Sequence, residues 1–572
     1  MSEKFIVPGK NAAALFTLKI YRGEGMALLA MNWKKGKPPV DFVGFAIEYM
    51  EPGGDRFFAL KNRVAFLGAD GKVNTKQLPT TLAPIQKFRW VHFPRNAEML
   101  GDFTYKVTPV FMNGSDELSY GEAQTAALEL RRETYPKKLN VTFTRGFVSS
   151  QAFVDRYESV APISTLLPPE ADEGLTFVPT HPKTSEAVAW MGFEARHAIL
   201  EALDQAIVDS EAQVRVVAYD LSEPEIVTRL EKLGSRLKVI IDNDGAHGEP
   251  HSGESQSEER LKISAGAGNV KRQHMGKLQH NKTIVVDSPK IKLAVCGSTN
   301  FTWRGFYVQA NNAVILKGKN AIKPFLEAFN NYWNNDSPAS FGATPSAQWT
   351  NLGLTGVDAK ISFSPHIPSN ALLQSVANDI RDKTKSSLFY SLAFLYQTPG
   401  VMQDAIKHIS ENDAIFVYGI SDKKVGGLDL QKPNGNVSPV APSALTDKTT
   451  PEPFKSEPAG GSGNRMHHKF LVIDFNKPGA RVYLGSYNFS IPADKDNGEN
   501  LLLIRDRRIA VSYAIEALRI FDHYHFRLAQ KEAKKARKQL ILSKPPRKPG
   551  ELPWWDEYYS DPQKVRDRWL FA

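Results

Sequence analysis

The sequence has almost no cysteine and no long apolar run, and both absences limit what the protein can be. Cys296 is the only cysteine among 572 residues, so neither an intrachain disulfide nor a zinc site built on several thiolates can form. No segment approaches the roughly 20 apolar residues of a membrane-spanning helix, and the first residues lack a secretion-signal pattern. We therefore expect a protein of a reducing compartment, the cytoplasm.

The composition is that of an ordinary globular protein with an excess of positive charge. Apolar residues make up 42% of the chain and charged residues 23%. One core does not extend over 572 residues, so the length predicts about three or four folding units. Lys and Arg outnumber Asp and Glu by 72 to 62, which gives a net charge of +10. This excess favours polyanionic partners, either nucleic acid or an anionic membrane surface.

Residues 1–135 have the pattern of an all-β domain. Short alternating or apolar runs, such as residues 42–49 and 103–111, are separated by turn signals such as Asn113-Gly114. We predict a β-sandwich of the immunoglobulin or fibronectin type, although no Cys-Trp-Cys pattern accompanies it. We expect this domain to act as a spacer or docking module rather than to carry catalysis.

After a proline-rich connecting segment, residues 136–185, the pattern changes to alternating strands and helices. The order strand, helix, strand occurs twice, at residues 214–219, 223–233 and 237–242, and at residues 387–394, 400–410 and 414–418. Each half continues with a polar loop, residues 243–277 or 421–464, then a motif strand and a helix rich in aromatic residues. We predict an α/β fold of two pseudo-symmetric lobes, residues 186–345 and 346–530, with mixed sheets flanked by helices that form one catalytic unit.

The last segment, residues 531–572, combines a predicted basic helix with an aromatic tail that contains Trp554, Trp555, Tyr558 and Tyr559. We expect a solvated helix and a packed tail. The alternative is base stacking by the aromatic rings, or contact with an acidic substrate.

Each lobe carries one copy of a His-x-Lys-(x)4-Asp motif followed by a Gly-Ser-x-Asn segment. The first copy supplies His280, Lys282, Asp287, Ser298 and Asn300. The second copy supplies His467, Lys469, Asp474, Ser486 and Asn488. One copy of this spacing arises by chance in some long chains, but two copies in repeated lobes, with the same apolar spacer, indicate a shared function.

The paired motifs resemble the signature of the phospholipase D superfamily, and the resemblance covers roughly residues 185–530. It implies a phosphodiesterase that requires no metal and no cofactor. It also implies that His280 is the nucleophile and that His467 is the general acid and then the general base. Beyond each Gly-Ser-x-Asn segment the family often has a side chain that orients a histidine, and the matching positions are Asn311 and Glu499. The amide in the first lobe resembles the arrangement in the two-lobed tyrosyl-DNA phosphodiesterases, whose first lobe also has an amide. This difference between the lobes leaves open which histidine attacks.

The spacing has a physical interpretation. Positions i and i+2 of a strand face the same side, so His280 and Lys282, and likewise His467 and Lys469, point together into a cleft. If the lobes meet about a pseudo-twofold axis, two imidazoles and two ammonium groups converge on one phosphate. The lysines neutralise its oxygens, helped by donors from the asparagines and serines of the Gly-Ser-x-Asn segments. One imidazole attacks phosphorus and the other protonates the leaving oxygen.

Other candidate groups have weaker support in the sequence. Asp287 and Asp474 are expected to make structural hydrogen bonds beneath the site rather than to transfer protons. We expect His247, His251, His274 and His468 to be solvated, and no acidic group with zinc spacing accompanies them, so no metal site is predicted. Lys271, Arg272 and Arg304 lie near the first motif and are candidates for contact with a polyanion.

The motifs do not identify the substrate, so three hypotheses remain. Nucleic-acid hydrolysis is favoured because the chain is basic and lacks an apparent anchor. Phospholipase D activity, releasing a head group from a membrane phospholipid, is the alternative, with loop 421–464 and Trp554/Trp555 inserting at the interface. A vestigial binding or scaffold protein is the third. The sequence leaves the oligomeric state open.

Overall fold

The computed structural model describes residues 4–68, 70–74, 76–130, 133–146, 149–168, 174–395, 399–421, 466–537 and 539–572. These residues form two compact units. The first unit contains the described residues up to 130 and those from 511 on, and the second contains the described residues between 133 and 510. None of the helices in these ranges combines the length and the hydropathy of a membrane span.

The N-terminal unit consists of antiparallel strands. Their bounds are Ile6–Pro8 (β1), Phe16–Arg22 (β2), Ala27–Trp33 (β3), Phe42–Met50 (β4), Phe58–Ala59 (β5), Lys61–Asn62 (β6), Leu78–Pro79 (β7), Arg89–His92 (β8), Asp102–Met112 (β9), Leu118–Tyr120 (β10) and Gln124–Glu129 (β11). One sheet has the order β1-β2-β3-β8 and another the order β10-β9-β4-β5, with β11 also paired to β9.

The burial pattern along β9 explains why this region forms sheets. Phe103, Tyr105 and Val107 are buried and the residues between them are partly exposed, as in a strand with one face on a core. One hydrophobic cluster contains Phe16 from the first sheet and Phe45 from the second. The strands agree with the all-β expectation, and the immunoglobulin or fibronectin type stays a prediction.

The aromatic tail belongs to this unit and is packed in its core. Trp555 and Tyr558 are buried in the same hydrophobic cluster, and the indole N–H of Trp554 donates to the carbonyl oxygen of Phe42 at 2.9 Å. The tail forms helices α11 (Glu557–Ser560) and α12 (Pro562–Phe571). Because Trp555 is only 5% exposed, it is not available to stack on bases or to insert into a membrane.

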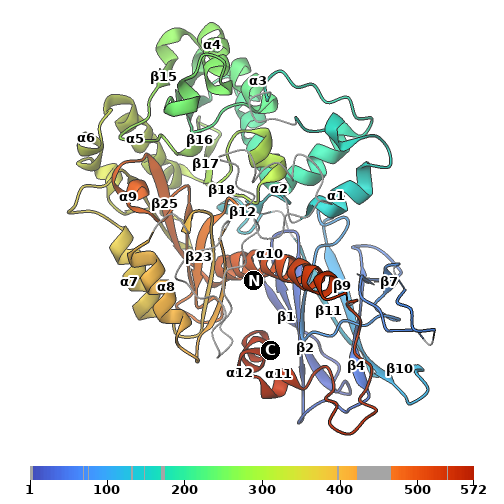
Figure 1. Cartoon of the computed structure of the whole chain (residues 1–572). Helices are drawn as coiled ribbons and strands as arrows, with labels where there is room; N and C mark the ends of the chain where they lie inside the picture. Colours follow the sequence, from blue (N-terminus) through green and yellow to red (C-terminus); the bar gives the residue numbers. More distant parts are fainter. Residues whose placement is uncertain are drawn as a thin grey trace. The chain divides into compact units, whose positions relative to one another are not determined.

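The second unit contains two seven-stranded mixed sheets (Figure 1). The strands of the first are Leu139–Phe143 (β12), Gln213–Ala218 (β13), Leu237–Ile241 (β14), Val270–Arg272 (β15), Lys282–Asp287 (β16), Lys292–Gly297 (β17) and Asn312–Lys317 (β18). The strands of the second are Thr350–Asn351 (β19), Asp358–Ser364 (β20), Ser387–Leu392 (β21), Phe416–Ile420 (β22), Lys469–Ile473 (β23), Arg481–Gly485 (β24) and Glu499–Arg505 (β25).

The two sheets repeat one strand order around their motif strands. The order is β12-β18-β17-β16-β13-β14-β15 in the first sheet and β19-β20-β25-β24-β23-β21-β22 in the second. In each sheet the motif strand, β16 or β23, lies between two antiparallel neighbours. Lys282 pairs with Ala218 and Lys469 pairs with Leu392, so each motif lysine begins its strand at a matching place. A twofold relation between the lobes stays a prediction.

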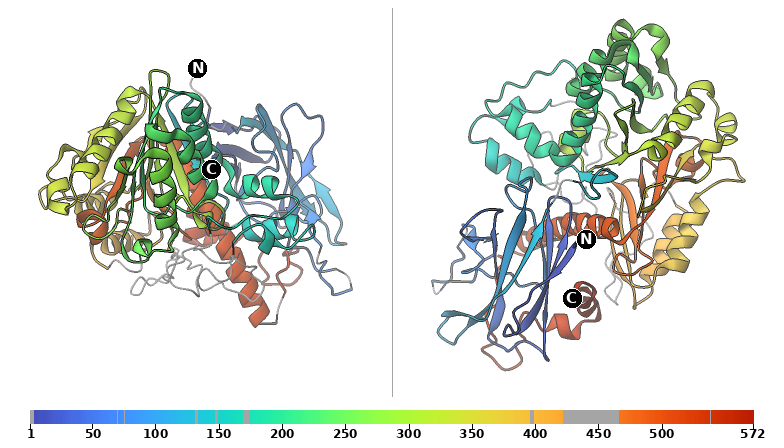
Figure 2. Two further views of the ribbon diagram at one scale, coloured as in Figure 1. Left: turned by 90° about the horizontal axis from the view of Figure 1, so that it is seen from above. Right: turned by 180° about the vertical axis from the view of Figure 1, so that it is seen from behind.

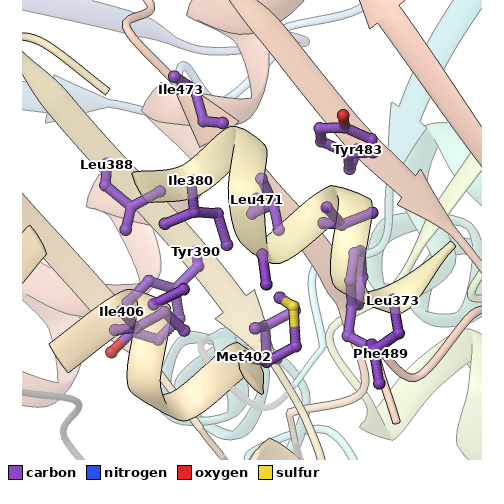
Figure 3. Close-up of a cluster of buried hydrophobic side chains, with 14 of the residues drawn as sticks. Leu373, Ile380, Leu388, Tyr390, Met402, Ile406, Leu471, Ile473, Tyr483 and Phe489 are labelled. Atoms are coloured by element: carbon purple, nitrogen blue, oxygen red, sulfur yellow. The ribbon is translucent and has the colours of Figure 1, made fainter. Parts of the chain in front are cut away.

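Helices cover these sheets. They are Ser150–Tyr157 (α1), Thr184–Val208 (α2), Pro224–Leu233 (α3), Gly253–Ala265 (α4), Lys319–Asn334 (α5), Pro338–Gly342 (α6), Leu373–Lys383 (α7), Val401–Ser410 (α8) and Ile491–Lys495 (α9). Helices α7 and α8 lie side by side beside the second sheet (Figure 2). There the apolar spacer of the second motif, Leu471 and Ile473, packs with Leu388, Ile380 and Ile406 (Figure 3). The motif strand is therefore anchored in a core while its first residues face the site.

Three predicted boundaries differ from the structure. The connecting segment, residues 136–185, contains β12, which pairs with β18 as the edge strand of the first sheet, and also α1. The second lobe was predicted to extend to residue 530, but residues from 511 belong to the N-terminal unit. This occurs because helix α10 (Arg507–Lys535) continues beyond β25, and there Ser512 donates to Glu24 at 2.8 Å. The predicted basic helix forms the end of α10, and several of its side chains lie outside the described residues.

The predicted polar loops have different outcomes. Residues 243–277 contain helix α4, which begins after Ser252, whose hydroxyl accepts the N–H of Ser255 at 3.1 Å. The buried face of α4 includes Glu254 and Ser257 beside Leu261, so apolar periodicity did not reveal it. The second loop, residues 421–464, lies almost entirely outside the described residues.

Candidate active site

The two motif histidines lie just before β16 and β23 and are buried. His280 is 3% exposed and His467 is 4% exposed. The ammonium group of Lys282 donates to the carbonyl oxygen of His280, and that of Lys469 donates to the carbonyl oxygen of His467 at 2.9 Å. The strands begin at the lysines, two residues later than predicted, yet each lysine stays beside its own histidine.

Each histidine is held by a side chain from the other half of the second unit. The Nδ1 atom of His280 lies 2.7 Å from Oε2 of Glu499 in β25. The Nδ1 atom of His467 lies 2.9 Å from Oδ1 of Asn311, the residue before β18. Both predicted orienting residues therefore contact an imidazole, and they do so crosswise. Burial lowers the pKa of His280, and so do the charges of its own Lys282 and of Lys469 and His467 from the other motif, as expected if the two motifs meet at one place.

Paired hydrogen bonds tie the two motif segments together. Asn281 accepts a bond at 2.9 Å from Asn500, the residue after Glu499. His468 lies 3.4 Å from the side-chain nitrogen of Asn312, the residue after Asn311. His468 is fully buried, so the expectation that it is solvated is wrong, whereas His251 and His274 are exposed as expected.

The Gly-Ser-x-Asn segments follow β17 and β24, and their glycines are required by close packing. A Cβ atom at Gly297 would lie 2.5 Å from the carbonyl oxygen of Asn312, and one at Gly485 would lie 2.2 Å from that of Asn500. The following serines hold the orienting side chains. Ser298 donates to Oδ1 of Asn311 at 2.9 Å, and Ser486 hydrogen-bonds to Glu499. The serines thus contact the groups behind the histidines, which differs from their predicted contact with phosphate.

The asparagines of these segments have unused hydrogen-bonding capacity. The side-chain oxygens of Asn300 and Asn488 are buried and accept no hydrogen bond from any described residue. The amide nitrogen of Asn300 donates to Oδ2 of Asp220. Because buried polar groups are normally satisfied, these two amide oxygens call for a hydrogen-bond donor that the described residues do not supply.

Burial controls the protonation of the site. It lowers the pKa of Lys282 to about 7, against the opposing effect of Glu499, and lowers the pKa of Lys469 well below its usual range. Burial and the nearby ammonium groups also lower the pKa of both motif histidines well below the usual range. Burial raises the pKa of the Glu499 carboxyl to about 8, although Lys282 opposes this. A bound anion would compensate the buried positive charge and favour protonated lysines.

The motif aspartates lie at the other ends of β16 and β23, away from the histidines. Asp287 is partly exposed and forms an ion pair with Lys292. Asp474 is buried and accepts the backbone N–H groups of Lys385, Ser386 and Ser387 at 2.8 to 3.0 Å. Neither aspartate is bonded to a motif histidine or lysine of the described chain. Their contacts are structural, so they are removed from the candidate reacting groups.

An acidic cluster beside the first motif is absent from the sequence prediction. His247 lies with Nε2 2.8 Å from Oδ1 of Asp220 and with Nδ1 2.8 Å from Oδ2 of Asp242. Burial alone would lower the pKa of His247, but these two carboxylates raise it to about 10. His247 is therefore not a solvated side chain. The available signal was positional, because Asp220 and Asp242 follow the adjacent parallel strands β13 and β14.

The same cluster contains the atoms best placed to hold a metal within the described ranges. Asp220, His247 and Glu254 each offer one ligand atom, and these atoms lie within 4.8 Å of one another. We expected no acidic partners for His247 from its sequence neighbours, and this was wrong because the partners come from distant positions. Both ring nitrogens of His247 already face carboxylates, which suits a bound proton.

Two basic residues near the first motif are engaged within the protein. Lys271 forms an ion pair with Asp336 at 2.6 Å. Arg272 pairs with Glu258 at 2.9 Å and donates to the carbonyl oxygens of Asp242 and His247. These contacts support the loop before His280 and differ from the predicted contact with a polyanion.

Comparison with known proteins supports the assignment drawn from the motifs. Residues 203–333 and 444–521, which include both motifs, match the family model described as cardiolipin synthase, phospholipase D-like domain. A stretch of 47 residues, 8% of this chain, is 49% identical to phospholipase D of Rickettsia prowazekii and covers 21% of it. A stretch of 63 residues, 11% of this chain, is 40% identical to mitochondrial cardiolipin hydrolase of Xenopus tropicalis and covers 28% of it.

These similarities are local. Among solved structures, the phospholipase D family member Nuc from Salmonella typhimurium matches 24% of this chain and 87% of its own length, at 27% identity and a TM-score of 0.21. The chain spans between 21% and 28% of the length of the two curated relatives described above. The matched family model nevertheless includes both His-x-Lys segments and the two Gly-Ser-x-Asn segments that follow them. The part of the chain that holds both motifs is therefore a phospholipase D-like domain.

Proposed function

We propose that the chain is a phosphodiesterase that hydrolyses its substrate through a covalent phosphohistidine and requires no metal. The observation that carries this proposal is the crossed pair of hydrogen bonds to Glu499 and Asn311. These bonds occupy Nδ1 of both imidazoles, so the Nε2 atom of each is left for chemistry. Lys282 and Lys469 supply positive charge beside them, as a phosphodiester anion requires.

In the first step, the Nε2 lone pair of His280 attacks phosphorus and the bond to the leaving oxygen breaks. That oxygen takes the proton from Nε2 of His467. As the N–P bond forms, the His280 ring becomes positively charged, and the carboxylate of Glu499 stabilises it. Lys282 and Lys469 neutralise the oxygens on phosphorus, and the amides of Asn300 and Asn488 bind them.

In the second step, His467 takes a proton from water as the water oxygen attacks phosphorus. The N–P bond breaks, His280 is released as the neutral imidazole, and His467 again carries its proton. Asn311 keeps the His467 ring in one orientation for both steps. Its Oδ1 faces His467, while its amide nitrogen donates to the carbonyl oxygen of Gly305 at 3.0 Å, which fixes the direction of the amide.

The substrate proposed first is nucleic acid, and phospholipid is the second candidate. The net charge of +10 and the proposed cytoplasmic location support nucleic acid. The relatives named phospholipase D and cardiolipin hydrolase support a phospholipid. The packing of Trp554 and Trp555 removes one argument for membrane insertion, and loop 421–464 lies outside the described residues.

The test is incubation of the purified protein in EDTA with labelled DNA, labelled RNA, and vesicles of phosphatidylcholine or cardiolipin. Cleavage of DNA or RNA would support a nuclease, and head-group or phosphatidic acid release would support a phospholipase. The variant His280→Ala serves as the control for contaminating enzymes. Absence of every product would contradict the enzyme proposal and favour a vestigial binding protein, while dependence on added metal would contradict the mechanism.

A further inference from the structure

The acidic cluster beside the first motif forms a continuous hydrogen-bonded chain that ends at Asn300. Asp242 binds Nδ1 of His247, Nε2 of His247 binds Asp220, and Oδ2 of Asp220 accepts from the amide nitrogen of Asn300. Asp242, His247 and Asp220 belong to neither a His-x-Lys nor a Gly-Ser-x-Asn motif. We infer that Asp220, held in place by His247 and Asp242, is a positioning residue that fixes the Asn300 amide for binding a phosphoryl oxygen.

This inference rests on the proposed function, because it assigns a role within the same site. An asparagine side chain has two N–H donors. One of them is bound by Asp220, which sets the plane of the amide and leaves the second donor for a ligand. Without an acceptor at residue 220 the amide can rotate by half a turn and present its oxygen instead. An oxygen next to an anionic phosphate is repulsive, so Asp220 selects the productive orientation.

The same hydrogen-bonded residues also lie close to the two other first-lobe groups of the site, His280 and Lys282. Oδ1 of Asp242 accepts the backbone N–H of Gln279, the residue before His280, at 2.6 Å. The ring of Tyr219 contacts the imidazoles of His247 and of His280 edge-on, with centroid distances of 4.6 and 4.5 Å. The ammonium nitrogen of Lys282 lies 4.6 Å from the centroid of that ring. The cluster thus contacts Gln279 and Tyr219, which lie against His280 and Lys282, and it also binds Asn300 directly.

Helix α4 anchors the backbone next to Asp220. Glu254 accepts the backbone N–H of Leu221 at 2.9 Å, and Ser257 donates to the carbonyl oxygen of Leu221 at 2.7 Å. Leu221 directly follows Asp220, so the helix fixes the backbone of the positioning residue. These two hydrogen bonds explain why the buried face of α4 carries the polar residues Glu254 and Ser257.

The second lobe has a different side chain at the equivalent position. Asp220 lies two residues beyond Ala218, the partner of Lys282, and Phe394 lies two residues beyond Leu392, the partner of Lys469. The Phe394 ring lies 5.5 Å from the ammonium nitrogen of Lys469. The carboxylate is therefore not required by the strand framework, which both lobes share, and it has to be explained by the first-lobe site itself.

The experiment compares Asp220→Asn with the matched control Asp379→Asn. Asp379 accepts bonds from Arg481 and Tyr483, and the exposed fractions of the Asp220 and Asp379 side chains are 19% and 20%. With the substrate cleaved by the wild type, kcat/KM of the Asp220 variant is expected to fall about 10- to 100-fold, as for loss of a group that orients a ligand. The Asp379 variant should retain wild-type kinetics.

The pH profile supplies a readout that a purely structural role would not change. Lys282 is faced by Glu499 from β25, Asp220 and Asp242 after β13 and β14, Lys469 from β23, and both motif histidines. Asp220 opposes the lowering of the Lys282 pKa by burial. Removing its charge should lower the pKa of Lys282 further, so the lower-pH inflection of kcat/KM, near pH 7, should move to lower pH. The control should leave this inflection in place.

A second measurement separates failure of this inference from failure of the proposed function. Binding of inorganic phosphate, measured by calorimetry in EDTA, should be weaker for the Asp220 variant than for the wild type and the Asp379 variant. If the wild type cleaves nothing, this comparison still tests the positioning role. His247→Gln, which leaves Asp220 in place, should show a smaller loss in the same direction and replaces Asp220→Asn if that variant does not fold.

Three results would overturn the inference. The first is equal kinetics and equal phosphate affinity for the Asp220 and Asp379 variants. The second is an unshifted lower-pH inflection, with a reduced melting temperature as the only change in the Asp220 variant. The third is loss of wild-type activity in EDTA with recovery on addition of zinc or manganese, lost again in the Asp220 variant, which would assign the cluster to a metal.

Discussion

The two halves of the candidate site share a backbone framework but differ in the side chains that support it. Both motif strands have the same neighbours and the same register. The first histidine, His280, contacts a carboxylate, and the second, His467, contacts an amide. The repeated strands therefore position the reacting groups in both halves. The residues that differ between the halves, Glu499 and Asn311, give each histidine its own role.

The charge of each orienting side chain predicts which histidine attacks phosphorus and which transfers the proton. A carboxylate stabilises an imidazole ring that becomes positive, which favours formation of an N–P bond at His280. A neutral amide orients an imidazole without stabilising its positive charge, so His467 gives up a proton more readily. The comparison therefore favours attack by His280 and proton transfer by His467, the direction that the sequence left open.

The largest expected effect comes from removing each histidine in turn. We expect His280→Ala to lower turnover by about 10⁴-fold or more, as for loss of a nucleophile. We expect His467→Ala to slow both steps, by about 10²- to 10⁴-fold, and to let a phosphoryl group accumulate on His280. Mass spectrometry after rapid quenching would detect it. Phosphate found on His467 in the His280→Ala variant would reverse the assignment.

A smaller effect is expected from exchanging the orienting groups. Glu499→Gln keeps the shape of the side chain but removes the charge that stabilises the His280–phosphorus adduct, so we expect kcat to fall by about 100-fold or more. Asn311→Asp adds a charge beside His467, makes it a weaker acid, and should lower kcat less. Steady-state kinetics of the two variants would check this order. Equal losses would show that the two partners do not differ in role.

The pH dependence of kcat/KM should report Glu499 and Lys282, whose pKa values are shifted in opposite directions. Glu499 has to be ionised and its pKa is raised to about 8, whereas Lys282 has to be protonated and its pKa is lowered to about 7. With this order of values, activity rises with pH up to about 7, is nearly constant to about 8, and then falls. Glu499→Gln should remove the acid limb. A maximum below pH 6 in the wild type would contradict the assignment.

The smallest effect is expected from the motif aspartates, as a difference in stability. Asp474→Ala leaves the backbone N–H groups of Lys385, Ser386 and the buried Ser387 without this acceptor, so we expect a loss of about 1–3 kcal/mol in the free energy of unfolding. Asp287→Ala removes a partly exposed ion pair and should cost less than about 1 kcal/mol. Urea denaturation of both variants would measure this difference. Similar losses of unfolding free energy in the two variants would show that Asp287 and Asp474 stabilise their strands equally.

Much of the site could be predicted because its signals are local and repeated. The spacing of His280 with Lys282 and of His467 with Lys469, followed by Gly-Ser-x-Asn, identified the groups that the structure brings together. Glu499 and Asn311 were found by counting from those segments. Their crosswise pairing was not predicted, because it depends on how the two sheets face each other.

What the sequence did not reveal is polar and non-local. Asp220, Asp242 and His247 converge from loops and strand ends far apart in the chain. Helix α4 was predicted as a loop because Glu254 and Ser257 occupy its inward face. The edge strand β12 was missed because its pairing partner, β18, lies well beyond it in the sequence. Such features follow from tertiary contacts, which periodicity does not encode.

The crossed contacts of His280 with Glu499 and of His467 with Asn311 have a consequence for shortened chains. A fragment with only the first half could assemble a two-histidine site only as a homodimer, in which an amide would face both imidazoles. A homodimer of the second half would instead place a carboxylate at both. Joining the halves in one polypeptide lets the two imidazoles be tuned independently, which no symmetric dimer of identical halves permits.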